Sequence, residues 1–296
     1  MKSTIQLFSI LFFVLITTKG SAQEVVYKLW EGQEKPFYKE NNLKEYEEEA
    51  WGTKCVFDIT EPTLTVYKAE GDNTGKAVII IPGGGYELVA MYHEGYDLAE
   101  ELAKQGITAA VLKYRLPKTE SSDQPHLVPL TDARRALKLL RQKAEQYGVN
   151  KNRVGVMGFS AGSHLSTVVS LWKSEDKMEN PDFSALIYGV TNLKEDNLQW
   201  LEESLYYRKL TKKEIAQNKL LDLVSEDTPP AFLVHAYDDD VCHVTETTLY
   251  AEKLFEHKVM AEMHLFPKGG HGFGMGREKD GTDQWVPLFV SWLRKI

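Results

Sequence analysis

Ser160 is the residue of this chain whose surroundings most strongly indicate chemistry. Gly158 and Gly162 flank it at a spacing of two residues, and the apolar run 154–157 precedes them. A G-x-S-x-G sequence after a buried strand is typical of a nucleophile elbow, a sharp strand-to-helix turn that forces its central residue into strained backbone geometry. Glycine on either side allows that turn to close without steric clash. The pattern predicts that Ser160 is a nucleophile.

A histidine and a cluster of carboxylates lie downstream of this serine. His271 lies in the glycine-rich loop 269–272, and the acidic cluster 238–240 ends another apolar run. A serine hydroxyl is a poor nucleophile at neutral pH and needs an adjacent base, which a histidine can provide. A carboxylate bonded to the far nitrogen of that histidine fixes its tautomer. The chain therefore contains a candidate triad in the order serine, acid, histidine.

The other histidines compete with His271 for the role of base. Those within predicted strands or helices suit packing or the surface better: His235, His257 and His264. His93 and His243 are candidate substrate contacts beside the site. His164 follows Ser160 by one helical turn and is a candidate for the floor of the site. His271 is the freest of these residues, because its loop precedes the final helical pattern.

A second glycine-rich loop is a candidate oxyanion hole. The apolar run 77–81 is typical of a fully buried strand, and it leads into Pro82-Gly83-Gly84-Gly85-Tyr86. An oxyanion hole needs backbone N–H donors aimed at the carbonyl oxygen that gains charge. We predict that Gly84, Gly85 and Ala161 supply these donors. The alternative is a merely flexible turn, but a turn rarely needs three consecutive residues without Cβ.

Alternating strands and helices must position these groups. The runs that predict strands are 64–67, 78–81, 108–112, 154–157, 185–188, 231–235 and 263–266. The patterns that predict helices are 96–105, 130–147, 161–172, 245–257 and 283–295. This alternation predicts an α/β protein with a mostly parallel central sheet flanked by helices, whose functional residues follow the carboxyl ends of strands. Ser160, Asp239 and His271 all lie at such ends.

Composition and charge narrow the class of protein. The chain has 296 residues, of which 43% are hydrophobic and 26% charged, as expected of a globular enzyme with a sizeable core. Its net charge of −8 disfavours nucleic acid or an anionic membrane as a partner. Cys55 and Cys242 permit one disulfide at most, although two separate buried thiols are the favoured interpretation. No metal-ligand spacing involves them.

The first 22 residues have the features of a signal peptide. Lys2 provides a positive start, residues 5–16 are apolar, and the small residues 20–22 precede Gln23. A membrane anchor is the alternative, but about a dozen apolar residues fall short of the roughly 20 that span a bilayer. We therefore expect export, and a secreted or periplasmic protein.

Two further segments interrupt the alternation. Residues 23–50 are polar and acidic and predict a surface lead-in that precedes a catalytic domain over 51–296. Residues 192–227 are helix-like and carry Trp200 and other aromatics among many charges. We interpret this second segment as a small helical cap inserted beside the site. The alternative is that its aromatic side chains pack inward and do not touch a ligand.

Over nearly all of its mature length, the chain resembles the carbohydrate-esterase-like α/β-hydrolases, which include secreted bacterial acetyl esterases and acetylxylan esterases related to feruloyl esterases. The motifs that carry the resemblance are Ile81-Pro82-Gly83-Gly84-Gly85-Tyr86, His93-Glu94-Gly95, Lys113-Tyr114-Arg115-Leu116, Asp132-Ala133-Arg134-Arg135-Ala136, Gly158-Phe159-Ser160-Ala161-Gly162, Asp227-Thr228-Pro229-Pro230, His235-Ala236-Tyr237-Asp238-Asp239 and Gly270-His271-Gly272-Phe273. The family pattern His-Gly/Ala-x-x-Asp implies Asp239 as the triad acid, with Asp238 as the alternative. Ser163 and His243 depart from the glycine and proline common there.

The resemblance implies an α/β-hydrolase fold and a serine carboxylic-ester hydrolase without cofactor or metal. The expected substrate is acetylated xylan or a related oligosaccharide, cleaved through an acyl-enzyme. A feruloyl or general short-chain carboxylesterase, a serine exopeptidase of the prolyl-oligopeptidase type and a non-catalytic relative are the alternatives. The exopeptidases commonly place tyrosine where this chain has Ala161. We further expect that Tyr86, Met91, Tyr92 and His93 narrow the acyl side of the pocket.

Overall fold

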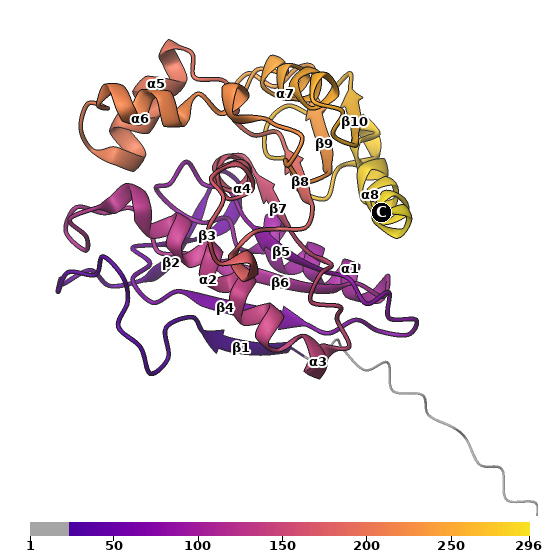
Figure 1. The fold of residues 1–296 in the computed structure, drawn as a ribbon, viewed down its shortest axis with the longest axis horizontal. Helices are drawn as coiled ribbons and strands as arrows, with labels where there is room; N and C mark the ends of the chain where they lie inside the picture. The colour runs from indigo at the N-terminus through magenta and orange to yellow at the C-terminus, as the bar shows by residue number, and fades with distance from the viewer. Residues whose placement is uncertain (1–23) are drawn as a thin grey trace, which may run out of the picture.

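The computed structural model describes residues 24–296, and a sheet of eight strands runs through their centre (Figure 1). The predicted signal peptide, residues 1–22, lies outside the described residues. In spatial order the strands are β1 (Glu24–Lys28), β4 (Thr63–Tyr67), β6 (Thr108–Lys113), β5 (Ala77–Ile81), β7 (Val154–Phe159), β8 (Ser184–Ile187), β9 (Ala231–Ala236) and β10 (Ala261–Phe266). The pairs β1–β4 and β4–β6 are antiparallel, and all other neighbours are parallel. The predicted α/β fold class is confirmed.

Helices cover both faces of this sheet. The longer ones are α1 (Asp97–Lys104), α2 (Val128–Gln142), α4 (Ala161–Leu171), α7 (Thr245–Glu256) and α8 (Trp285–Lys295). In Figure 1, α2 and α4 cross in front of the sheet, while α1 and α8 pack on its other face. Every residue of β5 and β7 is buried, because central parallel strands are covered on both sides and read as continuous apolar runs.

The predicted strands and helices are all present, with small shifts at their ends. One difference is at Lys143, where the helix predicted over 130–147 divides into α2 and the short α3 (Ala144–Tyr147). The remaining short helical segments are η1 (Tyr92–Tyr96), η2 (Pro125–Leu127), η3 (Lys177–Glu179), η6 (Glu278–Asp280) and η7 (Thr282–Gln284).

The predicted boundary at residue 50 differs from the structure. β1 is an edge strand of the central sheet, and β2 (Tyr46–Ala50) pairs with β3 (Thr53–Phe57) in a separate hairpin. The segment 23–50 is therefore partly built into the fold, and position 50 falls beside the turn of that hairpin. The sequence signal failed because both strands are mostly exposed and owe their conformation to pairing with a neighbour instead of to apolar residues.

Residues 192–227 form a small group of helices beyond one end of the sheet. It consists of α5 (Glu195–Leu201), η4 (Glu202–Tyr206), α6 (Lys212–Asn218) and η5 (Leu220–Leu223), and Figure 1 shows α5 and α6 set apart from the strands. Trp200 points inward: its ring stacks on Tyr86 at 5.5 Å between centroids, and its Nε1 donates to the carbonyl of Gly85 at 3.2 Å. This contact agrees with the alternative interpretation, in which the aromatics pack.

Three further observations complete the fold. Lys76, just before β5, donates through Nζ to the carbonyl oxygens of Leu293 and Ile296, the latter at 2.6 Å, and so ties the last helix to the sheet. Cys55 and Cys242 are both buried and are not bridged. Within residues 24–296, no helix combines the length and the apolar content needed to cross a membrane.

Candidate active site

The turn from β7 into α4 has the geometry of a nucleophile elbow. Ser160 has φ 49° and ψ −119°, a region that residues with a Cβ rarely occupy. A Cβ on Gly158 would lie 2.2 Å from the carbonyl oxygen of Gly162, and one on Gly162 would lie 2.0 Å from that of Ile81. Both glycines are therefore required by close backbone approach, as the sequence pattern predicts.

The structure brings Ser160, His271 and Asp239 together from three strand ends. Ser160 Oγ lies 2.8 Å from His271 Nε2, and His271 Nδ1 lies 2.8 Å from Asp239 Oδ2. In this arrangement the serine hydroxyl donates to Nε2, and the Nδ1–H of the histidine donates to the carboxylate. These are the contacts required for general-base activation of a serine.

Asp239 is held in place by backbone N–H groups and by two imidazole rings. Its Oδ1 accepts hydrogen bonds from the backbone N–H groups of Val241 at 2.9 Å and Cys242 at 2.8 Å. Burial by itself raises the pKa of this carboxyl, but hydrogen bonds from His235 and His271 outweigh it and hold the pKa below its usual range. Asp239 is therefore ionised wherever the protein is folded near neutral pH.

His235 supports the acid and does not approach the serine. Its Nε2 lies 2.7 Å from the carbonyl oxygen of Cys242, which only accepts, so this nitrogen carries a proton. The same nitrogen lies 3.2 Å from Asp239 Oδ2, and Nδ1 lies 2.7 Å from the hydroxyl of Thr247 on α7. The predicted place of His235 in a strand indicated packing or the surface and gave no contact with the acid; its position four residues before Asp239 was the available signal.

Asp238 contacts the loop of the base and not its ring. Its Oδ1 accepts from the N–H of Gly270 at 2.7 Å, next to His271. The ring of His271 is further held by Tyr188, whose ring centroid lies 5.0 Å away at an angle of 61°. Asp239 is thus the carboxylate placed to orient the imidazole, and Asp238 positions the backbone beside it.

The oxyanion loop follows β5 and lies against the elbow. Its Gly83 N–H donates to Glu94 Oε2 at 2.7 Å, so this donor is already used. Gly84 and Gly85 adopt positive φ values of 132° and 64°, and both line the same cavity as Ser160. Ala161 is the first residue of α4, where the N–H has no intrahelical acceptor. The three predicted donors, Gly84, Gly85 and Ala161, therefore remain the candidates.

Glu94 links this loop to the loop of His271, a role that sequence analysis missed. The carboxylate is only 3% exposed and accepts from Gly83 N–H and, through Oε1, from the Tyr188 hydroxyl at 2.8 Å. The same hydroxyl accepts from the N–H of Gly274 at 3.0 Å, three residues after His271. One buried carboxylate therefore fixes both the oxyanion loop and the histidine loop.

Tyr86 and His164, two of the residues predicted to line the substrate site, are buried. Tyr86 and His164 are 1% and 2% exposed and lie 2.8 Å apart, hydroxyl to Nδ1, behind the oxyanion loop. Burial lowers the pKa of His164 to about 3, so it stays neutral. The positive φ of Tyr86 turns its side chain into the core. His93 does line the cavity.

A cavity of about 560 Å³ opens above Ser160. Its lining comes from the oxyanion loop, from His93 and Glu94, from Asp240 and Val241 after the acid, and from Trp51 and Thr53 of the β2–β3 hairpin. Among the residues that line it, none comes from 192–227. Of the four residues predicted to narrow the acyl side, only His93 lines the cavity. Met91 is fully buried, and Tyr86 and Tyr92 are not among the lining residues, so that prediction was wrong for these three.

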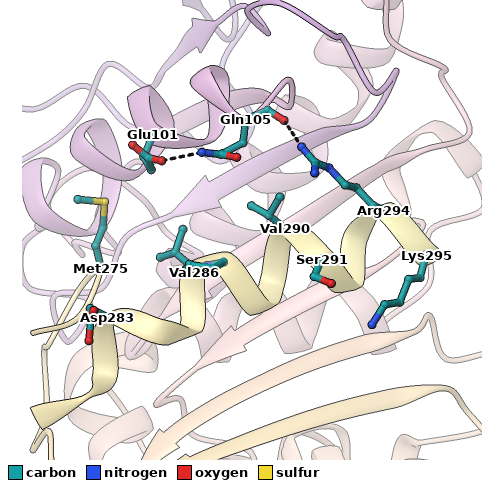
Figure 2. A pocket seen from close by; sticks show the side chains of 10 residues that line it. Glu101, Gln105, Met275, Asp283, Val286, Val290, Ser291, Arg294 and Lys295 are labelled. Atoms are coloured by element: carbon teal, nitrogen blue, oxygen red, sulfur yellow. Dashed lines mark hydrogen bonds between the residues drawn. The ribbon is translucent and has the colours of Figure 1, made fainter. Parts of the chain in front are cut away.

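A larger cavity, about 680 Å³, lies between α1 and α8, away from the triad (Figure 2). Figure 2 shows Gln105 at its edge. The side-chain amide of Gln105 donates a hydrogen bond to Glu101, and its backbone carbonyl oxygen accepts one from Arg294. Its lining includes the hydroxyl of Ser291 but no histidine that could activate it. The smaller cavity, which holds a nucleophile, a base and N–H donors, is the candidate active site.

The chain is similar to a known family and to known proteins over most of its length. The family described as BD-FAE matches residues 64–254. The chain is 33% identical over 231 residues to the acetylxylan esterase of Xylanibacter ruminicola, which covers 75% of this chain and 46% of the relative. It is 30% identical over 227 residues to the endo-1,4-beta-xylanase B of Butyrivibrio fibrisolvens, and this match covers 74% of this chain and 35% of the relative. The chain thus spans less than half the length of these curated relatives.

Solved structures share nearly the whole fold. An acetyl ester-xyloside bifunctional hydrolase from Caldicellulosiruptor lactoaceticus superposes with a TM-score of 0.77 at 30% identity, over 94% of this chain and 98% of that one. MGS-M1, an α/β hydrolase enzyme from a Medee basin deep-sea metagenome library, superposes with a TM-score of 0.60 at 25% identity. The superposition covers 86% of this chain and 97% of that one.

The two neighbouring aspartates should differ sharply on substitution. Asp239→Asn should lower kcat on an ester by about 10⁴-fold, because asparagine cannot hold the required tautomer of His271. Asp238→Asn retains an oxygen that accepts from Gly270 and should cost less than about tenfold. Steady-state kinetics of both purified variants test this ranking, and the reverse order would make Asp238 the acid.

Asp239 should also make stability depend on pH. A carboxyl whose pKa is lowered by folding stabilises the protein above its unfolded pKa of about 3.9, and this stabilisation is lost as the pH falls through the folded value. The free energy of unfolding of the wild type should therefore fall more steeply than that of Asp239→Asn between about pH 5 and pH 2. Denaturant titrations measure both, and parallel curves would contradict the assignment.

Glu94→Gln should impair turnover more than binding. An amide cannot accept from both Gly83 N–H and the Tyr188 hydroxyl, so we expect kcat to fall about 10- to 100-fold with a smaller change in KM. Glu100→Gln, on the exposed side of α1, is the matched control. Equal kinetics in the two variants, or a rise in KM alone, would show that Glu94 does not position the oxyanion loop.

Proposed function

This chain belongs to the BD-FAE family, and we propose that it is a serine carboxylic-ester hydrolase. The observation that carries the proposal is the contact of Ser160 Oγ with His271 Nε2 at 2.8 Å, in a cavity lined by Gly84 and Gly85. An activated hydroxyl beside free N–H donors suits attack on an acyl carbon, since the charge that develops on the carbonyl oxygen is then stabilised.

The proposed reaction has two halves. His271 takes the proton of Ser160 as Oγ attacks the ester carbonyl, and Asp239 stabilises the imidazolium that forms. The N–H groups of Ala161 and of Gly84 or Gly85 bind the oxyanion. His271 then protonates the departing alcohol, which leaves an acyl-enzyme on Ser160. Water, activated by the same histidine, releases the acid and restores the serine.

We propose acetylated xylan or its oligosaccharides as the substrate. Support comes from two relatives at 30% identity or more, one named acetylxylan esterase and the other an acetyl ester-xyloside hydrolase. The cavity of about 560 Å³ has to hold the acyl group and part of a sugar, which favours a small acyl group. A feruloyl or general short-chain carboxylesterase is the alternative within this chemistry.

The proposal extends to location and domain organisation. Residues 1–22 act as a leader that directs the protein to the periplasm or the outside of the cell, where plant polysaccharides are met. The folded part is one catalytic domain, and residues 192–227 act as a brace of the oxyanion loop through Trp200, which donates to the Gly85 carbonyl.

Acyl preference tests this function. With p-nitrophenyl esters, kcat/KM should fall from acetyl to butyryl to octanoyl, because a longer acyl chain and the leaving group must share the same cavity of about 560 Å³. Acetate should leave acetylated xylo-oligosaccharides faster than ferulate leaves feruloylated ones. Ser160→Ala should fold and lose about 10⁶-fold in turnover.

Other outcomes would favour the alternatives. Flat or rising activity with chain length, or faster release of ferulate, would promote the feruloyl or general esterase. Hydrolysis of an aminoacyl p-nitroanilide in preference to esters would promote the exopeptidase, and full activity of folded Ser160→Ala would end the serine mechanism.

A further inference from the structure

Trp51 is an aromatic side chain in the candidate active site with no part in the chemistry above. It is 71% exposed, yet it lines the same cavity as Ser160 and His271. It lies in the two-residue turn between β2 and β3, where Ala50 pairs with Thr53. A large apolar ring left in water at the mouth of a cavity is a candidate binding surface.

The hairpin that carries Trp51 is fixed to the oxyanion loop. Val56 on β3 and Val89 exchange two backbone hydrogen bonds of 2.9 Å each. Buried Cys55 packs with Leu88 and Ala90 in a small apolar cluster beneath the hairpin. The indole is therefore presented at a defined place relative to Gly84 and Gly85, even though its own ring is mostly uncovered.

The backbone of the turn is unfavourable for tryptophan. Trp51 and Gly52 have φ values of 53° and 76°, as in a type I′ turn, whose first position favours asparagine, aspartate or glycine. A bulky residue at positive φ is strained, and such strain gathers at functional sites. The strain and the exposure both oppose folding, so the stability of the fold does not explain why an indole occupies this position.

The ligand that fits this surface is neutral and has an apolar face. The carboxylates that line the cavity are Glu94 and Asp240, and no lysine or arginine is among its lining residues, so an anionic ligand finds no cationic side chain there. A pyranose ring presents a face of C–H groups that stacks on an indole, and its hydroxyls donate to carboxylates such as Asp240. Val241, also exposed, lines the same cavity and offers a second apolar contact.

We propose that Trp51 is the stacking platform for a sugar ring on the alcohol side of the ester. This inference rests on the proposed esterase function and adds a specific subsite to it. The exposed indole marks the outer rim, and the sugar chain, being the long part of the substrate, must leave the cavity there. The small acyl group takes the inner space beside the oxyanion loop.

Trp51→Asn removes the indole, and asparagine suits the turn better than tryptophan. This variant should therefore fold, with a thermal unfolding midpoint equal to or higher than that of the wild type. Trp51→Phe retains a stacking face. Phe255→Ala is the matched control. Phe255 is an aromatic residue near the end of α7 that is 82% exposed and does not line the cavity. All variants are made in the full chain.

The measurement is the ratio of kcat/KM for acetylated xylo-oligosaccharides to kcat/KM for ethyl acetate, which has no ring to stack. We expect Trp51→Asn to lower this ratio about threefold to tenfold, mainly through KM, with Trp51→Phe in between and Phe255→Ala at the wild-type value. An unchanged ratio in Trp51→Asn, or the same fall in Phe255→Ala, would overturn the proposal.

A binding assay separates this inference from the proposed function. Xylohexaose, which carries no ester, is titrated by calorimetry into Ser160→Ala and into Ser160→Ala with Trp51→Asn. Weaker binding in the double variant supports the platform even if the wild type releases no acetate. Equal affinity, or no binding by either, overturns the platform even if the wild type is an efficient acetyl esterase.

Discussion

The close approach of the elbow to the end of β5 is the constraint on which the rest of this site depends. Ser160 occupies a backbone conformation of the kind that costs about 1 to 3 kcal/mol, and packing must hold it there. Gly162 lies against the carbonyl of Ile81, and a Cβ on Gly83 would lie 2.9 Å from that of Ser160. The same packing that strains the nucleophile therefore places the oxyanion loop beside it.

Polar groups in the interior extend this constraint to the other two loops. Glu94 accepts hydrogen bonds from the oxyanion loop and from the Tyr188 hydroxyl. Tyr188 in turn accepts a hydrogen bond from Gly274, and its ring packs edge to face with His271. His235 binds the loop of the acid from the strand before it and, through Thr247, connects that loop to α7. Each group is satisfied in the interior, so the loops are held by specific hydrogen bonds and not by apolar contact alone.

Sequence reasoning located what depends on local pattern. The strands of the central sheet other than β1, the principal helices and the candidates Ser160 and His271 follow from apolar runs, glycine spacing and position at strand ends. The choice of Asp239 within the acidic cluster 238–240 came from the family resemblance. Sequence reasoning missed β1 and β2, whose mostly exposed residues form strands because a partner is present, and β3, in which only two residues are buried. It also placed Tyr86 and His164 at the substrate, since the sequence does not reveal that a positive φ turns one side chain into the core to meet the other.

The bond from Lys76 to the carbonyls of Leu293 and Ile296 joins residues 217 and 220 positions apart. His271 is likewise 111 positions from Ser160, its hydrogen-bond partner. Contacts between residues so far apart in the sequence form late in folding, because the entropy cost of closing a long loop precedes the stabilisation that its contacts provide. A partly synthesised chain that ends before His271 contains Ser160 but lacks the imidazole that would activate it, and it also lacks the Gly274 N–H that bonds to Tyr188.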